Sequence, residues 1–215
     1  MIRARRHWML AGAAGTAALA AARLAGAQEA PREGRDYRRV VPAQPTDVPA
    51  GKIEVIEFFW YGCPHCNALE PFLQEWAKKL PPDVVLRRVH VPFGDRRHQQ
   101  LYYTLVAMGR AEALNDKVFH AIHVDNDRLD TPEKMTAMLS RHGVDAKQFM
   151  DVYNSFAVRT AMRRAAQVSE AYGIEGVPSF GVAGKYITAP SMAGSNQAAL
   201  RVVDWLVARE RQGAK

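Results

Sequence analysis

The stretch Ile53–Cys66, with the sequence IEVIEFFWYGCPHC, decides the fold of this chain of 215 residues. Ile53–Phe59 is β-branched and aromatic, and its nearly continuous apolar character is typical of a strand covered on both faces. A helical pattern begins at Asn67. Pro64 favours a first helical turn, because its φ is fixed and it lacks the N–H that would go unpaired there. The stretch therefore predicts a strand that passes into a helix through a turn bearing two cysteines.

Cys63 and Cys66 are the only two cysteines in the chain. Two sulfurs at this spacing, at the start of a helix, can close a disulfide within one turn. The first sulfur lies at the positive end of the helix dipole, which favours the thiolate over the thiol. We therefore expect redox chemistry, with Cys63 as the reactive sulfur and Cys66 as its resolving partner.

Two other interpretations of the CxxC motif stay open on these residues alone. A structural zinc site takes four ligands, commonly a second Cys pair or a His pair. The chain has no third cysteine, so zinc would need a mixed site with His120 and His123. An inert structural disulfide is the other alternative, but so short a loop removes little entropy from the unfolded chain. The redox interpretation is favoured over both, and we expect no metal and no cofactor besides the disulfide itself.

Residues 1–27 have the three parts of a cleavable signal peptide. A basic start with three arginines precedes an apolar, alanine-rich stretch at 8–22 and an Ala-Gly-Ala cleavage signal at 25–27. A membrane anchor is disfavoured, because the apolar stretch is shorter than the roughly 20 residues that a spanning helix needs and Arg23 interrupts its end. The Arg5-Arg6 pair leaves the choice between the general and the twin-arginine export routes open. The pattern predicts export to an oxidising compartment.

Removal of this segment changes the charge of the chain. Residues 1–27 hold four of the 29 basic residues and none of the 22 acidic ones, so the formal charge falls from +7 to +3. The sequence has no clustered Lys/Arg stripe and no repeat of basic and aromatic residues, which argues against nucleic acid as a partner. The remaining length suits one domain, or one domain with an insertion, and can bury a core without disulfides.

The rest of the chain divides into four predicted parts. Residues 28–46 are polar and proline-containing and should form a loose N-terminal arm, with order beginning near Gly51. Residues 47–97 form the first part of the α/β domain: Ile53–Phe59, a helix that contains Pro71, and a strand at Val84–Val91. This β-α-β unit should have a right-handed parallel crossover.

Residues 98–170 carry helical patterns only, and we expect an insertion of several helices. Thr131 and Asp145 are predicted N-caps, and Pro132 occupies the first helical position after Thr131. Residues 171–215 complete the α/β domain. They begin with a hairpin that turns at 183–185, and they end with a helix at Asn196–Arg211 that should cover the sheet.

A strand, a CxxC motif at a helix start, an internal Pro71 and a late Gly176-Val177-Pro178 before a hairpin together resemble the thioredoxin fold. The Pro64-His65 dipeptide between the cysteines and the helical insertion narrow this resemblance to the DsbA family of periplasmic thiol:disulfide oxidoreductases. The resemblance covers essentially the whole chain after residue 27. It implies fold class α/β, a thioredoxin-like fold with an all-helical insertion domain.

The resemblance also implies roles for residues near the two cysteines. Pro64 and His65 stand between them, and a cationic or donating His65 would stabilise the Cys63 thiolate; a solvated loop side chain is the alternative for His65. Glu57 corresponds to the buried acid beneath the active-site disulfide, where it could relay a proton to or from Cys66. A strand-edge carboxylate without a role is the alternative for Glu57.

Pro178 corresponds to a cis-proline beside the disulfide, with a trans turn proline as the alternative. A cis bond would turn Val177 so that its backbone can pair with an extended substrate chain. Trp60, Tyr61 and Met192 are candidates for an apolar rim that accepts unfolded chains. Packing in the core or on the surface is an equal alternative for Tyr61 and Met192.

The resemblance implies a monomeric, periplasmic dithiol oxidase that donates its disulfide to exported proteins as they fold. A membrane quinone reductase resembling DsbB would reoxidise it. A disulfide isomerase or reductase is one alternative, although isomerases of this type usually carry an N-terminal dimerisation domain for which the 28–46 arm leaves no room. The glutathione-dependent isomerase branch with a similar insert is disfavoured by the intact CxxC motif. A peptide-binding chaperone module is an alternative of another class.

Overall fold

The computed structural model describes residues 29–213, and the predicted signal peptide at 1–27 lies outside them. The helices and strands of these described residues belong to one of two compact units, Pro31–Lys215. Within the described residues, no helix is both long and apolar enough to span a membrane.

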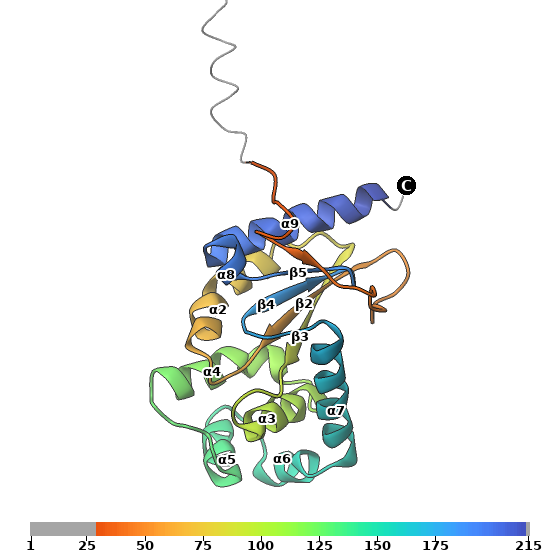
Figure 1. Ribbon diagram of the computed structural model, residues 1–215. Coiled ribbons are helices and arrows are strands. Elements are labelled where there is room, and N and C mark those ends of the chain that lie inside the picture. Colours follow the sequence, from red (N-terminus) through yellow and green to blue (C-terminus); the bar gives the residue numbers. More distant parts are fainter. Residues whose placement is uncertain (1–28, 214–215) are drawn as a thin grey trace, which may run out of the picture. The chain divides into compact units, whose positions relative to one another are not determined.

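A five-stranded mixed sheet forms the centre of this unit (Figure 1), in the order β1-β5-β4-β2-β3. β2 (Ile53–Phe59) pairs in parallel with β3 (Val84–His90) and antiparallel with β4 (Ser179–Val182). β4 continues through a hairpin into β5 (Tyr186–Thr188). The predicted parallel unit and hairpin are confirmed, and β2 lies inside the sheet with six of its seven residues buried.

The expectation of a loose N-terminal arm with order beginning near Gly51 is wrong. β1 (Arg38–Arg39) pairs antiparallel with β5 and closes that edge of the sheet. Tyr37 is 3% exposed and packs its ring against those of Tyr186 and Trp205. The arm is ordered because β5 would otherwise present unpaired backbone groups, and because Tyr37 buries a large apolar surface.

Helices cover both faces of the sheet. α2 (Pro64–Ala77) and α9 (Asn196–Gly213) pack on one face, where Leu69 and Leu73 share a core cluster with Val203 and Leu206. The short α8 (Pro190–Ala193) precedes α9. α7 (Phe156–Ala171) covers the other face, and its Ala165 lies in a cluster with residues of β2 and β3. Pro71 lies within α2, as the sequence predicts.

The predicted helical insertion is present and runs from green to teal in Figure 1. It contains α3 (Arg96–Ala107), α4 (Ala111–His123), α5 (Pro132–Ser140), α6 (Ala146–Tyr153) and α7. The predicted N-caps are confirmed, because the side chain of Thr131 accepts from the N–H of Lys134 and that of Asp145 from the N–H of Gln148. One hydrophobic cluster joins the insertion to the turn after β2, and it includes Cys63 and Cys66.

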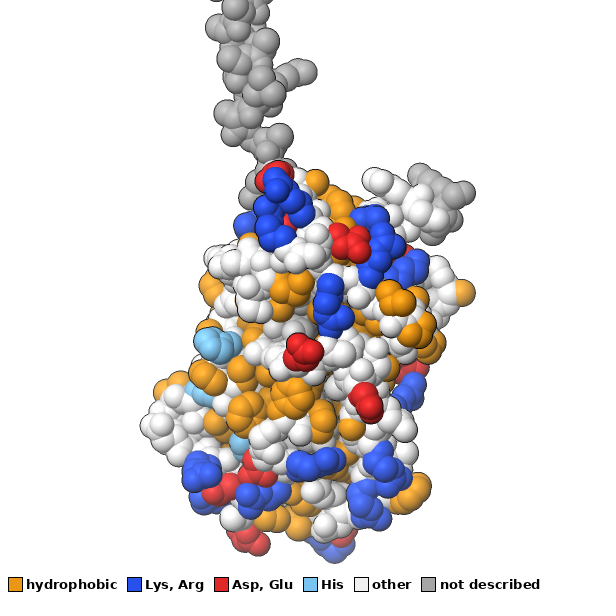
Figure 2. All heavy atoms as spheres, viewed as in Figure 1, with side chains coloured by type: hydrophobic (Ala, Val, Ile, Leu, Met, Phe, Trp, Pro, Cys, Tyr) orange, Lys and Arg blue, Asp and Glu red, His pale blue; other side chains and the backbone are white. Residues whose placement is uncertain are grey.

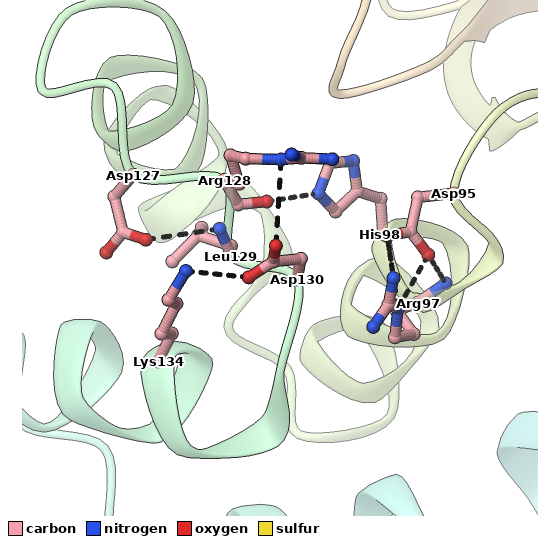
Figure 3. A network of polar contacts seen from close by, with 8 residues as sticks. All are labelled: Asp95, Arg97, His98, Asp127, Arg128, Leu129, Asp130 and Lys134. Carbon is pink, nitrogen blue, oxygen red and sulfur yellow. Dashed lines mark hydrogen bonds and ion pairs between the residues drawn. The ribbon is translucent and has the colours of Figure 1, made fainter.

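The loop between α4 and α5 is fastened to the start of α3 (Figure 3). Nε2 of His98 lies 2.8 Å from the carbonyl oxygen of Arg128, so the ring donates to it. The Asp127 carboxylate accepts from the N–H of Leu129, and Asp130 pairs with Lys134 at 2.8 Å. These contacts hold the chain in place directly after α4 ends at His123.

Candidate active site

The two cysteines lie where the turn after β2 becomes α2. Cys63 is the N-cap residue, with φ −86° and ψ 117°, and Pro64 occupies the first helical turn. The N–H of Cys63 donates to the carbonyl of Trp60 at 3.0 Å, which tightens the turn. Both cysteines carry free thiols, and they are 6% and 0% exposed respectively. The predicted placement of the CxxC motif at a helix start is confirmed.

The two thiols differ in acidity. The pKa of Cys63 falls to about 6, mainly because the Cys66 thiol donates to its sulfur, with further help from the backbone N–H groups of Cys66 and His65 and from the charge of His65, while burial acts in the opposite direction. Burial raises the pKa of Cys66 far above the usual value, and the hydrogen bond to Cys63 and the charge of Glu57 act the same way. At neutral pH the pair holds one thiolate, at Cys63.

A surface groove of about 630 Å³ lies beside Cys63. His65, Ile174, Val177, Pro178 and Met192 are among its lining residues. The Val177–Pro178 bond is cis, as the resemblance implies. Sγ of Cys63 lies 3.5 Å from the carbonyl oxygen of Val177, so the reactive sulfur is next to the backbone that borders the groove. Hydrophobic side chains gather in the middle of the face seen in Figure 2, between the more strongly charged ends.

The two aromatic residues before the motif, Trp60 and Tyr61, do not form the apolar rim that the sequence predicts. Tyr61 is 0% exposed, and its ring packs edge-on against those of Phe59 and Phe119, so the core alternative holds for Tyr61. Trp60 is half-buried, and its indole lies where a side chain on Gly62 or Gly94 would collide with it. Trp60 therefore packs against the turn that carries the cysteines and does not line the groove.

Glu57 lies on β2 with no exposed surface, in a strand that is paired on both sides. The strand-edge alternative for this residue is therefore wrong. Burial raises the pKa of Glu57 to about 7, with the positive charge of Arg88 opposing this and the negative charge of Glu70 reinforcing it. Nε of Arg88 lies 3.2 Å from Oε2 of Glu57. A carboxyl group with this pKa can exchange a proton near neutral pH.

Sequence reasoning missed the ion network around Arg88. Its two terminal guanidinium nitrogens each bond the carboxylate of Glu70 at 3.0 Å, and Asn115 donates to the same carboxylate at 3.1 Å. Arg88 stands opposite Glu57 in the parallel register of β2 and β3. Arg88, Glu70 and Asn115 border a second groove, of about 720 Å³, between α2, β3 and α4. Strand register would be needed to find this network, because its members are up to 58 residues apart in sequence.

The zinc alternative finds no support among residues 29–213. No group of three or more His, Cys, Asp or Glu side chains in that range is placed to hold a metal ion. His120 pairs instead with Asp125 at 3.4 Å, and Nε2 of His123 lies 2.7 Å from the carbonyl oxygen of Tyr61. The two histidines of the mixed-site alternative thus have other partners.

Comparison with known proteins supports the redox interpretation of this geometry. Residues 54–199 match the family described as the DSBA-like thioredoxin domain. The thiol:disulfide interchange protein DsbA of Bordetella parapertussis is 45% identical over 199 residues, which cover 91% of this chain and 94% of that protein. The protein of the same name from Pseudomonas aeruginosa is 41% identical over 184 residues, covering 85% and 87%.

Solved structures agree in fold. The crystal structure of Pseudomonas aeruginosa DsbA has a TM-score of 0.81 at 40% identity and covers 85% of this chain and 96% of its own. The oxidoreductase NmDsbA1 of Neisseria meningitidis has a TM-score of 0.72 at 28% identity, covering 85% and 95%. With two thiols of opposed acidity beside a cis-proline groove, the chain belongs to the family of DsbA-like thioredoxin-domain proteins and is a thiol:disulfide oxidoreductase.

Proposed function

We propose that this enzyme oxidises protein dithiols through a mixed disulfide at Cys63. The observation that carries the proposal is the opposed acidity of Cys63, whose pKa is about 6, and Cys66, whose pKa is raised. A thiol with an ordinary pKa near 8.5 is only a few per cent ionised at pH 7, whereas Cys63 is mostly thiolate. Stabilising the thiolate stabilises the reduced enzyme, so the disulfide becomes a strong oxidant.

The proposed reaction has two exchange steps. A substrate thiolate attacks Sγ of Cys63 in the Cys63–Cys66 disulfide, and Cys66 leaves with the electron pair of the broken S–S bond. A second substrate thiolate then attacks the substrate sulfur of the mixed disulfide, and Cys63 leaves as a stable thiolate. The substrate loses two electrons and gains a disulfide, while the enzyme ends as a dithiol.

We propose Glu57 as the proton donor to Cys66. Cys66 is fully buried and its pKa is raised, so the thiolate released in the first step must be protonated where it forms. Glu57 is buried, has a pKa of about 7 and acts electrostatically on Cys66. In the reverse half of the cycle the same carboxylate accepts that proton. The transfer prevents an unpaired negative charge on the buried sulfur of Cys66 and leaves the charge on Glu57, 3.2 Å from Nε of Arg88.

We propose that substrates dock as extended chains against Val177 and Pro178. The Val177 carbonyl lies 3.5 Å from Sγ of Cys63, close enough for one backbone pairing to set the approach of a substrate sulfur. Met192 and Ile174 supply apolar contacts in the adjoining groove, and His65 lies at its border. Backbone pairing with apolar contacts fits a broad range of unfolded chains, because neither depends on a particular side chain.

We propose further that the enzyme works as a monomer in the periplasm, after cleavage of residues 1–27. Its substrates would be exported proteins that are still folding, and a membrane quinone reductase resembling DsbB would restore its disulfide. We propose that the mature chain divides into four parts: 28–46, 47–97, 98–170 and 171–215. The helical run from α3 at Arg96 to α7 at Ala171 supports the boundaries of the insertion.

A stoichiometric oxidation experiment tests the proposal. The oxidised enzyme is mixed with a reduced, unfolded protein that has two cysteines, and both partners are followed by thiol alkylation and mass spectrometry. We expect the substrate to gain one disulfide as Cys63 and Cys66 appear as thiols. An enzyme that leaves the two substrate thiols intact, yet in its reduced form opens substrate disulfides, would instead be a reductase or isomerase. An enzyme that binds the substrate without exchange would be a chaperone module.

A further inference from the structure

Two histidine rings hold the backbone of Tyr61, two residues before the reactive cysteine. The N–H of Tyr61 donates to Nε2 of His90 at 3.2 Å, and its carbonyl oxygen lies 2.7 Å from Nε2 of His123. His90 ends β3 and His123 ends α4. The turn that carries Cys63 is therefore tied to the sheet by one ring and to the helical insertion by the other.

The partners of these rings determine which nitrogen carries the hydrogen. Nε2 of His90 accepts from Tyr61, so its Nδ1 must be the protonated nitrogen and donates to the carbonyl of Val91 at 3.0 Å. His90 is completely buried, and burial lowers its pKa to about 3, so it stays neutral. A carbonyl oxygen can only accept, so His123 must carry a hydrogen on Nε2.

The ring of His123 is held in place by its surroundings. It stacks on the buried ring of Phe119 at 28° between planes and 6.0 Å between centroids. The chain then turns back, because the N–H groups of Val124 and Asp125 both donate to the carbonyl of His120. The following loop is fastened to α3 through the Arg128 carbonyl and His98, as Figure 3 shows. His123 thus presents Nε2–H to Tyr61 from a rigid position.

We infer that His123 is a positioning residue through which the helical insertion holds the Tyr61–Gly62 peptide, and with it Cys63, against the start of α2. This inference rests on the proposed role of Cys63 as the reactive thiol. The Cys66 thiol, the backbone N–H groups of Cys66 and His65, and the charge of His65 stabilise the Cys63 thiolate. Hydrogen bonds of this kind weaken steeply as their length and angle change. A turn free to rotate at the Tyr61–Gly62 peptide would hold the sulfur less well against these donors.

Three variants of the full-length enzyme test this inference. His123→Leu removes the donor, whereas His123→Gln can place an amide N–H near the position of Nε2. His120→Leu is the matched control, because His120 lies on the same helix but is exposed and pairs with Asp125. The pKa of Cys63 in each reduced variant is measured from thiolate absorbance against pH.

We expect His123→Leu to raise the Cys63 pKa by about one unit, a tenfold change in the ionisation constant. His123→Gln and His120→Leu should stay close to the unsubstituted enzyme. An unchanged pKa in His123→Leu overturns the inference, and so does an equal rise in His123→Gln or in His120→Leu. The Cys63 pKa of the unsubstituted enzyme tests the proposed function, which requires a low value whatever the role of His123. The differences in Cys63 pKa between the variants and the unsubstituted enzyme test the role of His123.

The tautomer of His123 supplies a measurement that does not depend on any variant folding. Nitrogen NMR of the unsubstituted enzyme, with labelled histidine, distinguishes a ring protonated at Nε2 from one protonated at Nδ1. We expect neutral His123 to carry its hydrogen on Nε2, with the peptide nitrogen of Gly62 shifted by the bond to the Tyr61 carbonyl. A neutral ring with its hydrogen on Nδ1 cannot donate to that carbonyl and overturns the inference.

Discussion

Sγ of Cys63 lies 3.5 Å from the carbonyl oxygen of Val177, although 114 residues separate the two in sequence. The contact brings the start of α2 against the cis Val177–Pro178 bond that precedes β4. β2 makes it possible, because β2 pairs with β4 on one side and delivers the CxxC turn at its own end. The sulfur of Cys63 and the backbone of Val177 are thus positioned by the same sheet.

Replacing each cysteine separately should give opposite results. Cys66→Ala leaves the Cys63 thiolate able to attack a disulfide of a substrate protein and to form a mixed disulfide with it, but removes the neighbouring thiol that would displace the substrate. Covalent complexes with disulfide-containing proteins should therefore accumulate on non-reducing gels. Cys63→Ser should give no such complexes and no thiol oxidation. Recovery of complexes through Cys66 in the Cys63→Ser variant would reverse the assignment of the two sulfurs.

His65→Leu should raise the pKa of Cys63. His65 supplies a positive charge and a backbone N–H to the thiolate, and the substitution removes only the charge. We expect a rise smaller than the whole depression, because the Cys66 thiol and the N–H groups remain; about one unit is the expected size. Thiolate absorbance against pH measures it, and a pKa that stays at the unsubstituted value would assign His65 no electrostatic role.

The stability difference between the reduced and the oxidised enzyme should depend on pH. Cys63 has a pKa of about 6 in the folded reduced form and about 8.5 when unfolded, so between these values the unfolded state binds more protons. The unfolding free energy of the reduced form, minus that of the oxidised form, should therefore rise from pH 6 to about 8.5 and be lost as pH falls through 6. Denaturant titrations of both forms measure this difference, and a flat profile would contradict the depressed pKa.

Glu57→Gln should separate stability from catalysis. Because burial raises the pKa of Glu57 to about 7, the unsubstituted protein loses stability as pH rises from the unfolded value near 4.5 through 7. The neutral amide removes that loss, and Arg88 keeps its bonds to Glu70, so the variant should be more stable at pH 8 by about 1–3 kcal/mol. The first exchange step should nevertheless become slower, because Cys66 loses its proton donor. Stopped-flow exchange that keeps its rate would remove Glu57 from the mechanism.

Much of the architecture could be predicted from local sequence signals. The run Ile53–Phe59, the N-caps Thr131 and Asp145 and the hairpin turn near Ala183 each depend on residues close together in the chain. The same holds for the cysteines at the start of α2, because one turn of helix contains both.

Long-range pairing explains what could not be predicted. β1 has only two residues, both arginines, and it is a strand because β5 offers an open edge. The burial of Tyr61 depends on Phe119 of the insertion, and the Arg88–Glu70 pair depends on the placement of β3 beside α2. His90 and His123 bond the N–H and the carbonyl of one residue, Tyr61, from opposite parts of the fold. No local sequence pattern predicts any of these contacts.

The reduction potential of the Cys63–Cys66 disulfide tests the central claim most directly, namely that this pair gives its disulfide away. It is measured by equilibrating the enzyme with mixtures of reduced and oxidised glutathione and quantifying the two enzyme forms. We predict a value more positive than about −180 mV, because the Cys63 thiolate stabilises the reduced form. A value near the roughly −270 mV of thioredoxin would contradict the oxidase account and make the enzyme a reductant.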